Sequence, residues 1–193
     1  MVLFGSSPSI LTPIIVLAAI LLFVGAIVGL RILKVIRKLK KLAKKHENLH
    51  TNGRTDLKKN GFSTSKEYEY LDFYKYKNYS FELFLDSQNK RLAIFSYREK
   101  ELSYFTFDQI KSIEVFLNGE SLGNTVPQSI NQDTVGSFKI NIATSHKDFP
   151  VYKIKLKRGN KKHSIFSAGD AIKFTRDIVD AINEVIAYNQ SNK

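Results

Sequence analysis

The uncharged apolar run from Ile10 to Leu30 constrains this chain more than any other feature of its sequence. Counted from Ile10 to Leu30, the run holds 21 residues, and a helix of roughly 20 apolar residues crosses a hydrocarbon core about 30 Å thick. The nine residues before it carry no Lys or Arg, unlike the start of a secretory signal peptide. We predict a transmembrane helix at residues 10–30 after a short extracytoplasmic tail at residues 1–9, with a cleaved signal peptide as the alternative.

A strongly basic segment follows the apolar run directly. Between Arg31 and Lys45 there are eight cations and no acid. These cations are Arg31, Lys34, Arg37, Lys38, Lys40, Lys41, Lys44 and Lys45. By the positive-inside rule, a basic flank on this side places the N-terminus outside the cell and the C-terminal region in the cytoplasm. We therefore predict a single-pass protein of the cell membrane whose cations contact anionic lipid headgroups of the inner leaflet.

The helix is expected to continue beyond the membrane. Apolar residues recur at spacings of three and four among the cations, at Ile32, Val35, Ile36, Leu39 and Leu42. This pattern predicts a basic amphipathic juxtamembrane helix over residues 31–49 that rests at the headgroups. A coiled coil or a solvated stalk is the alternative.

Two glycines within the apolar run have the spacing of a helix-pairing motif. Gly25 and Gly29 form a GxxxG pair, which lets two transmembrane helices approach closely. They mark a possible face for a homodimer.

The net charge of +12 is spread unevenly along the chain. Residues 1–61 carry 11 Lys and Arg against 2 acids, a balance of +9, and residues 62–193 carry 19 against 16, a balance of +3. A nucleic-acid-binding protein usually carries its basic patch on the folded domain, so we predict no nucleic-acid partner. The chain has no cysteine, which excludes disulfides, Cys-ligated zinc and thiol catalysis.

The remaining sequence reads as a linker and then a β-rich domain. The turn dipeptides Asn52-Gly53 and Asn60-Gly61 predict a linker over residues 50–61. Alternating apolar residues between turn signals predict strands downstream, after an irregular lead-in strand within residues 68–79. The strands are expected at 80–85, 91–98, 101–107, 110–117, 137–143, 150–157 and 162–166.

The chain is expected to end in a helix of about 20 residues. Ser167 or Asp170 can cap its start. One apolar stripe at helical spacing comprises Ala171, Phe174, Ile178, Ala181, Ile182, Val185 and Ile186.

One motif with catalytic potential lies at the end of the basic segment. His46-Glu47-Asn48-Leu49-His50 reads H-E-x-x-H. On a helix the two histidines share a face and can bind zinc, while the glutamate polarises a water molecule. The motif follows Lys44-Lys45 and runs into polar residues, which is typical of a solvated helix end, and no third ligand stands out downstream. We therefore interpret it as a chance match and predict no cofactor, with a zinc metallopeptidase using His46, Glu47 and His50 as the alternative.

The order of strands and several local segments carry a resemblance to a known family. The segments are Leu85–Ile94, Phe107–Ile110, Ile113–Val115, Ile140–Ile142, Pro150–Ile154 and the terminal helix. They resemble the pleckstrin-homology-like (PH-like) domains of bacterial membrane proteins. The resemblance implies an α+β fold, with residues 62–193 forming a small β-barrel of about seven strands capped by the C-terminal helix. Members of this family mostly bind proteins, peptides or lipid headgroups. Lys90-Arg91 stand near the family's headgroup-binding cations, but the rest of that pattern is incomplete.

These observations favour a non-enzymatic binding or adaptor protein anchored in the membrane. Its cytoplasmic PH-like domain would bind an unidentified protein partner or the anionic membrane surface. Two alternatives remain open: the zinc metalloprotease, and a structural subunit of a bacterial envelope or mobile-element complex.

Overall fold

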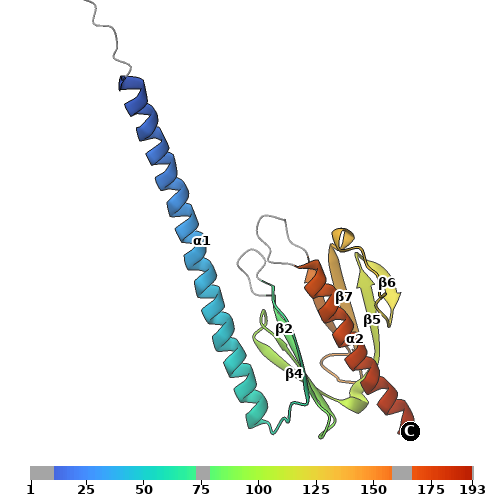
Figure 1. Cartoon of the computed structure of the whole chain (residues 1–193). Coiled ribbons are helices and arrows are strands. Elements are labelled where there is room, and N and C mark those ends of the chain that lie inside the picture. The colour runs from blue at the N-terminus through green and yellow to red at the C-terminus, as the bar shows by residue number, and fades with distance from the viewer. Residues whose placement is uncertain (1–10, 73–78, 158–166, 193) are drawn as a thin grey trace, which may run out of the picture. The chain divides into compact units, whose positions relative to one another are not determined.

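A computed structural model describes residues 11–72, 79–157 and 167–192, and the side chains from Ile15 onward within those ranges except that of Lys157. It contains two long helices and two antiparallel sheets (Figure 1). The helices are α1 (Leu11–Lys59) and α2 (Ala168–Ser191), with short 3₁₀ turns η2 (Phe107–Gln109) and η3 (Gln132–Thr134). The strands are β1 (Lys66–Tyr70), β2 (Phe81–Asp86), β3 (Arg91–Ser96), β4 (Glu101–Thr106), β5 (Ile110–Leu117), β6 (Glu120–Gly123), β7 (Ser137–Thr144) and β8 (Val151–Lys157).

Helix α1 is one uninterrupted element from Leu11 to Lys59. The predicted helices at residues 10–30 and 31–49 are therefore two parts of it, and the loop expected over residues 50–61 is wrong as far as Lys59. Asn52-Gly53 does not form a turn, because both residues lie inside the helix.

The end of α1 is defined by the second turn dipeptide. Gly61 has φ of +62°, and its amide donates to the carbonyl of Lys58 at 3.0 Å. The Phe62 amide donates to the Leu57 carbonyl, also at 3.0 Å. This paired arrangement is the Schellman motif, in which a left-handed glycine ends a helix and satisfies its last carbonyls. Asn60-Gly61 therefore ends helix α1.

The N-terminal part of α1 is long and apolar enough to cross a membrane, and among the residues that the structure describes it is the one helix with this property. None of its most apolar stretch is buried within the chain, and large side chains such as Leu22 and Phe23 are 76% and 69% exposed. These exposed apolar side chains make the stretch a candidate membrane span.

The eight strands within the described residues form two four-stranded antiparallel sheets. Sheet A has the order β1-β2-β3-β4, and sheet B has the order β6-β5-β7-β8. The dipeptide Asn118-Gly119 joins β5 to β6, with φ of +53° and +99° at the two residues, as a two-residue hairpin with the favoured twist requires. β6 is not among the strands expected from the sequence, and the strand expected at residues 162–166 lies outside the described residues.

The two sheets and α2 enclose the main hydrophobic core. Ser167 caps α2 by accepting a hydrogen bond from the Asp170 amide at 3.2 Å. The apolar stripe of α2 is buried as predicted, apart from the partly buried Ile186, and at its far end the Asn189 side chain donates to the carbonyls of Phe107 and Ile110. The core residues that the sheets contribute include Leu83, Leu85, Leu92, Ile94, Phe105, Ile113, Val115, Phe138, Ile140, Ile142, Ile154 and Leu156.

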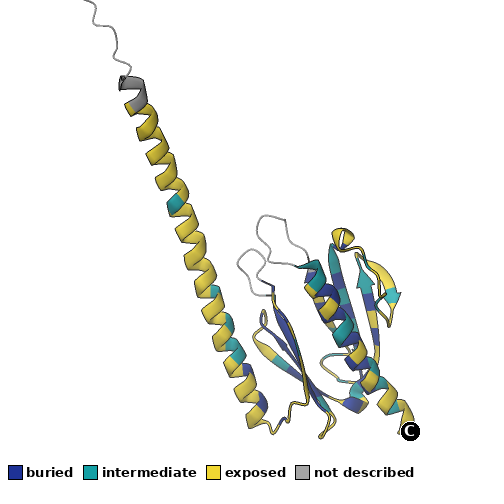
Figure 2. Cartoon of the chain, in the orientation of Figure 1, coloured by how far each residue is buried: buried dark blue, intermediate teal, exposed yellow. Residues whose placement is uncertain are grey.

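The two inner strands of sheet A are buried on both faces. Every residue of β2 is buried, as is every residue of β3 except Arg91, whereas a strand with one solvated face would alternate. The face of sheet A that points away from the main core carries a second apolar cluster, which includes the end of α1. Its buried residues are Leu57, Phe62, Phe84, Ala93, Phe95 and Tyr97. Buried positions in the last turns of α1 and in β2 and β3 are visible in Figure 2.

The architecture is therefore α+β: a long N-terminal apolar helix, two four-stranded antiparallel sheets and a C-terminal helix. Among the described strands, pairing stays within each sheet. The chain divides into two units, residues 1–41 and residues 42–193. The folded unit therefore begins at Leu42, before the predicted boundary at Phe62, because the last third of α1 packs against sheet A.

Candidate functional site

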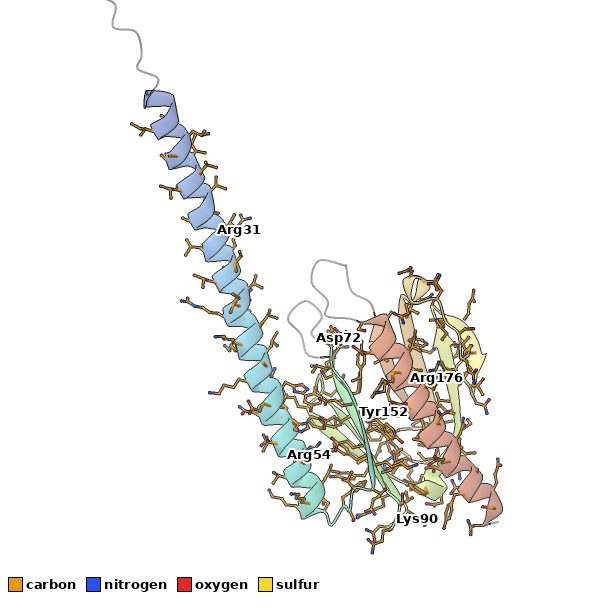
Figure 3. The ribbon with its side chains drawn as sticks, in the orientation of Figure 1. Arg31, Arg54, Asp72, Lys90, Tyr152 and Arg176 are labelled. Atoms are coloured by element: carbon orange, nitrogen blue, oxygen red, sulfur yellow. The ribbon has the colours of Figure 1, made fainter. Side chains whose placement is uncertain are left out.

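The outer face of sheet A, defined here as the face covered by α1, brings several predicted site residues together. The partly or fully buried residues in the last third of α1 recur at spacings of three and four, and they are Leu42, His46, Leu49, His50, Gly53 and Leu57. A Cβ atom on Gly53 would lie 3.7 Å from the Phe95 ring. Arg54, labelled in Figure 3, forms an ion pair with Glu67 of β1 at the edge of this contact.

His46 and His50 meet two glutamates from the sheet, and we call these four residues the His–Glu cluster. His50 Nδ1 hydrogen-bonds Glu82 Oε1, and His46 Nε2 lies 3.5 Å from Glu69 Oε1. The side chain of Glu82 is completely buried, while those of His46, His50 and Glu69 are 15%, 29% and 44% exposed. The Tyr97 hydroxyl donates a hydrogen bond to Glu82 Oε1, and its ring stacks on that of His46 with centroids 4.2 Å apart.

Burial governs the electrostatics of this cluster. Desolvation raises the pKa of Glu82 above its ordinary value, although hydrogen bonds from Tyr97 and to His50 oppose the shift. Desolvation also lowers the pKa of His46, against the attraction of the Glu69 charge. The pKa of Tyr97 is strongly raised by burial and by its hydrogen bond to Glu82, so this hydroxyl stays a hydrogen-bond donor at neutral pH.

Hydrogen bonds of Arg91 and Asp86 join the C-terminal end of α1 to the β2–β3 hairpin, and we call them the Arg91–Asp86 network. Arg91 donates to the carbonyls of Asn60 and Gly61 and to Asp86 Oδ2, the last at 2.8 Å. Asp86 also accepts from the Ser63 amide at 3.0 Å and from the Asn89 side chain at 2.8 Å. Burial opposes the ionisation of Asp86, but these hydrogen bonds outweigh it and lower its pKa to about 2.

A cleft of about 630 Å³ lies between the two sheets, lined by β4 of sheet A and β8 of sheet B. Both are edge strands, each with one unpaired side within its described sheet. Tyr152 of β8, labelled in Figure 3, hydrogen-bonds Ser103 of β4, and burial raises its pKa to about 12. Apolar side chains of the cleft come from Phe81, Phe149, Val151 and Tyr152, and charged ones from Asp72, Arg98, Glu99, Glu101, Lys153 and Lys155.

The remaining predicted site residues stay on the surface. All eight cations from Arg31 to Lys45 are exposed, and a Cβ atom on Gly25 or Gly29 would meet nothing within 4 Å. Glu47 is exposed too. The expectation of a solvated end for the H-E-x-x-H segment is wrong for His46 and His50, because α1 turns both toward sheet A.

Sequence reasoning did not identify Glu69, Glu82 and Tyr97 as neighbours of the motif. One available signal was the continuation of the three–four spacing from Leu42 through Leu49 to Leu57, interrupted by two histidines and a glycine. A second signal was Glu82, a lone acid within the apolar strand Phe81–Leu85, since a buried carboxylate requires a partner.

Comparison of the chain with protein-family models, with curated proteins and with solved structures gives no match. Function must therefore be argued from the residues themselves.

Proposed function

We propose that this protein is a membrane-anchored, non-enzymatic binding protein whose β-rich unit binds a protein partner in the cleft between β4 and β8. The observation that carries the proposal is this mixed apolar and charged cleft between two edge strands, in a chain that also has a helix able to span a membrane. The PH-like character of the β-rich unit is part of the proposal, and two antiparallel sheets with a C-terminal helix support it.

The cleft has the features of a peptide-binding surface. An exposed edge strand can pair with an extended peptide through its backbone, while side-chain pockets supply specificity. Val151, at 42% exposure, and the partly buried Tyr152 ring offer apolar contacts. Arg98, Lys153 and Glu101 around them offer both signs of charge, which suits a polar peptide better than a bare anionic headgroup.

The membrane side of the proposal is a single pass with the N-terminus outside and the β-rich unit in the cytoplasm. The exposure of the basic segment supports it, because each Lys or Arg near an anionic surface contributes about 1 kcal/mol. Binding of the β-rich unit to that surface, and homodimers through Gly25 and Gly29, remain predictions.

The two alternatives have less support. A zinc metallopeptidase would need Glu47 beside the metal-bound water, but Glu47 is exposed and the carboxylates grouped with His50 come from Glu69 and Glu82. A structural subunit of an envelope or mobile-element complex would use the same cleft as a docking surface, so it differs from the main proposal in the partner alone.

Two experiments in cells test the proposal. In the first, fractionation with protease protection should place the chain in the cell membrane with its β-rich unit on the cytoplasmic side. Digestion of that unit by external protease would contradict the orientation.

In the second experiment, a photoreactive amino acid is placed at position 151 in the cleft or, as the matched control, at the exposed position 173 on α2. We expect a discrete protein adduct from position 151 alone. Equal adducts from both positions, or lipid adducts alone, would contradict a protein-binding cleft.

A further inference from the structure

The two glutamates of the His–Glu cluster oppose each other directly across the sheet. Glu69 of β1 pairs with Glu82 of β2 in the antiparallel register, so both side chains leave sheet A on the same face. Directly opposed like charges destabilise a sheet, and the Glu82 side chain is completely buried. The arrangement therefore favours a positive charge between the two carboxylates.

Helix α1 supplies two nitrogen ligands at the same place. His46 and His50 are four residues apart, so their side chains lie on one face of the helix, and that face covers Glu69 and Glu82. One ligand atom each from His50, Glu69 and Glu82 lies within 4.8 Å of the other two. His46 Nε2 lies 3.5 Å from Glu69 Oε1, beside this group.

One atom of the cluster points independently to a ligand. Glu82 Oε1 is satisfied by Tyr97 and His50, but Glu82 Oε2 is buried and has no hydrogen-bond partner among the described residues. Leaving a buried carboxyl oxygen unpaired costs free energy, so such an atom calls for an explanation, and an ion is one of the accepted ones.

We propose that the His–Glu cluster binds a divalent transition-metal ion, with His50, Glu69 and Glu82 as ligands and His46 completing a tetrahedral site. Imidazole nitrogen and carboxylate oxygen are ordinary zinc ligands, and two carboxylates neutralise a doubly charged ion. Metal–ligand bonds of about 2.0–2.2 Å place tetrahedral ligand atoms roughly 3.4 Å apart. The side chains therefore draw together from their present spacing when the ion binds.

The neighbours of the cluster suit a metal site. The Tyr97 hydroxyl holds Glu82 by a hydrogen bond, as outer-shell groups hold metal ligands, and the Tyr97 ring fixes the His46 ring by stacking. Four protein ligands leave no open position for a water molecule, which is the arrangement of structural zinc sites. The ion would join the last part of α1 to β1 and β2 and so hold the membrane-proximal helix on the sheet. This role goes beyond the proposed binding function.

The test is a zinc titration of the full-length protein in detergent micelles, after chelator treatment, in competition with a chromophoric chelator. The variants are Glu69→Gln, Glu82→Gln and His50→Gln. The matched controls are Glu67→Gln, on the same face of β1, and His146→Gln, a histidine outside the cluster. We expect one zinc ion per wild-type chain. Each cluster variant should weaken binding by about 100-fold or more, since even outer-shell changes cost about 10- to 100-fold.

Melting curves with and without zinc give a second readout. Zinc should raise the melting temperature of the wild type and of both controls, and this rise should disappear in the cluster variants. Glu69→Gln keeps the test valid if Glu82→Gln fails to fold, because Glu69 is partly exposed.

Absence of stoichiometric zinc binding by the wild type, or unchanged affinity in the Glu69→Gln variant, would overturn the proposal. Either result would leave the protein-binding cleft untouched.

Discussion

The substitution Gly53→Ala distinguishes a helix docked on sheet A from a linker, because the two interpretations predict opposite signs. Gly53 is a buried residue inside α1, and the added Cβ atom would meet the Phe95 ring at 3.7 Å, an ordinary van der Waals contact. Glycine within a helix costs about 1 kcal/mol relative to alanine. We therefore expect Gly53→Ala to raise the free energy of unfolding by about 1 kcal/mol and the melting temperature by about 2–4 °C.

The assay is urea unfolding of the full chain in detergent, followed by tyrosine fluorescence, since the chain has nine Tyr and no Trp. Gly61→Ala is the matched control. Because Gly61 has φ of +62°, a side chain is disfavoured at this position. Gly61→Ala should therefore lower the free energy of unfolding by about 1 kcal/mol. In an Asn-Gly turn, Gly53 would also need a positive φ. A loss of stability in Gly53→Ala similar to that in Gly61→Ala would therefore refute the helical docking.

Three further predictions follow from the same region. Leu57→Ala removes a side chain that is 2% exposed and should lower the free energy of unfolding by about 2–5 kcal/mol, whereas Leu71→Ala, at an exposed position, should change it by less than about 0.5 kcal/mol. Asp86→Asn should lower the free energy of unfolding by about 2 kcal/mol at pH 7, because the pKa of Asp86 is about 2 in the folded protein and its ordinary value is 3.8. Glu69→Gln should stabilise the metal-free protein by about 0.5 kcal/mol, since it removes a like-charge pair, while it weakens zinc binding.

Each of these predictions has its own check. For Leu57→Ala, a urea midpoint equal to that of Leu71→Ala would contradict the burial of the helix end. For Asp86, the folded-state pKa is depressed, so its stabilising contribution is complete above the ordinary pKa and is lost as pH falls from about 3.8 toward about 2. The free energy of unfolding of the Asp86→Asn variant should not show this loss at low pH. The same pH dependence in the variant as in the wild type would contradict a stabilising role of the Arg91–Asp86 network. For Glu69→Gln, lower stability in chelator would contradict repulsion between the paired glutamates.

Local patterns predicted most of the β-rich unit. Strands β2 to β5, β7 and β8 lie where alternation and turn signals place them, and Asn118-Gly119 forms its hairpin because it can adopt positive φ at both positions. The apolar run at residues 10–30 is helical where described, and the stripe of α2 from Ala171 to Val185 is buried. These features depend on neighbouring residues, so one sequence suffices to find them.

The features that the sequence did not reveal depend on contacts between distant segments. Asn52-Gly53 has strong turn chemistry, yet packing against Phe95 keeps it helical, which is a case of tertiary structure overriding local propensity. The His–Glu cluster needs the register that sets Glu69 opposite Glu82 and the helix that covers both. Neither the register nor the covering helix follows from the spacing within the H-E-x-x-H motif.

The central structural claim is that the last part of α1 belongs to the folded unit and does not tether it. Hydrogen–deuterium exchange of the full chain in detergent measures this directly, because buried helical amides exchange only when the structure opens. We predict that amides of residues 50–59 exchange as slowly as those of β2 and β3. Complete exchange of residues 50–59 within seconds, with β2 and β3 still protected, would show that this segment is a linker and would contradict the claim.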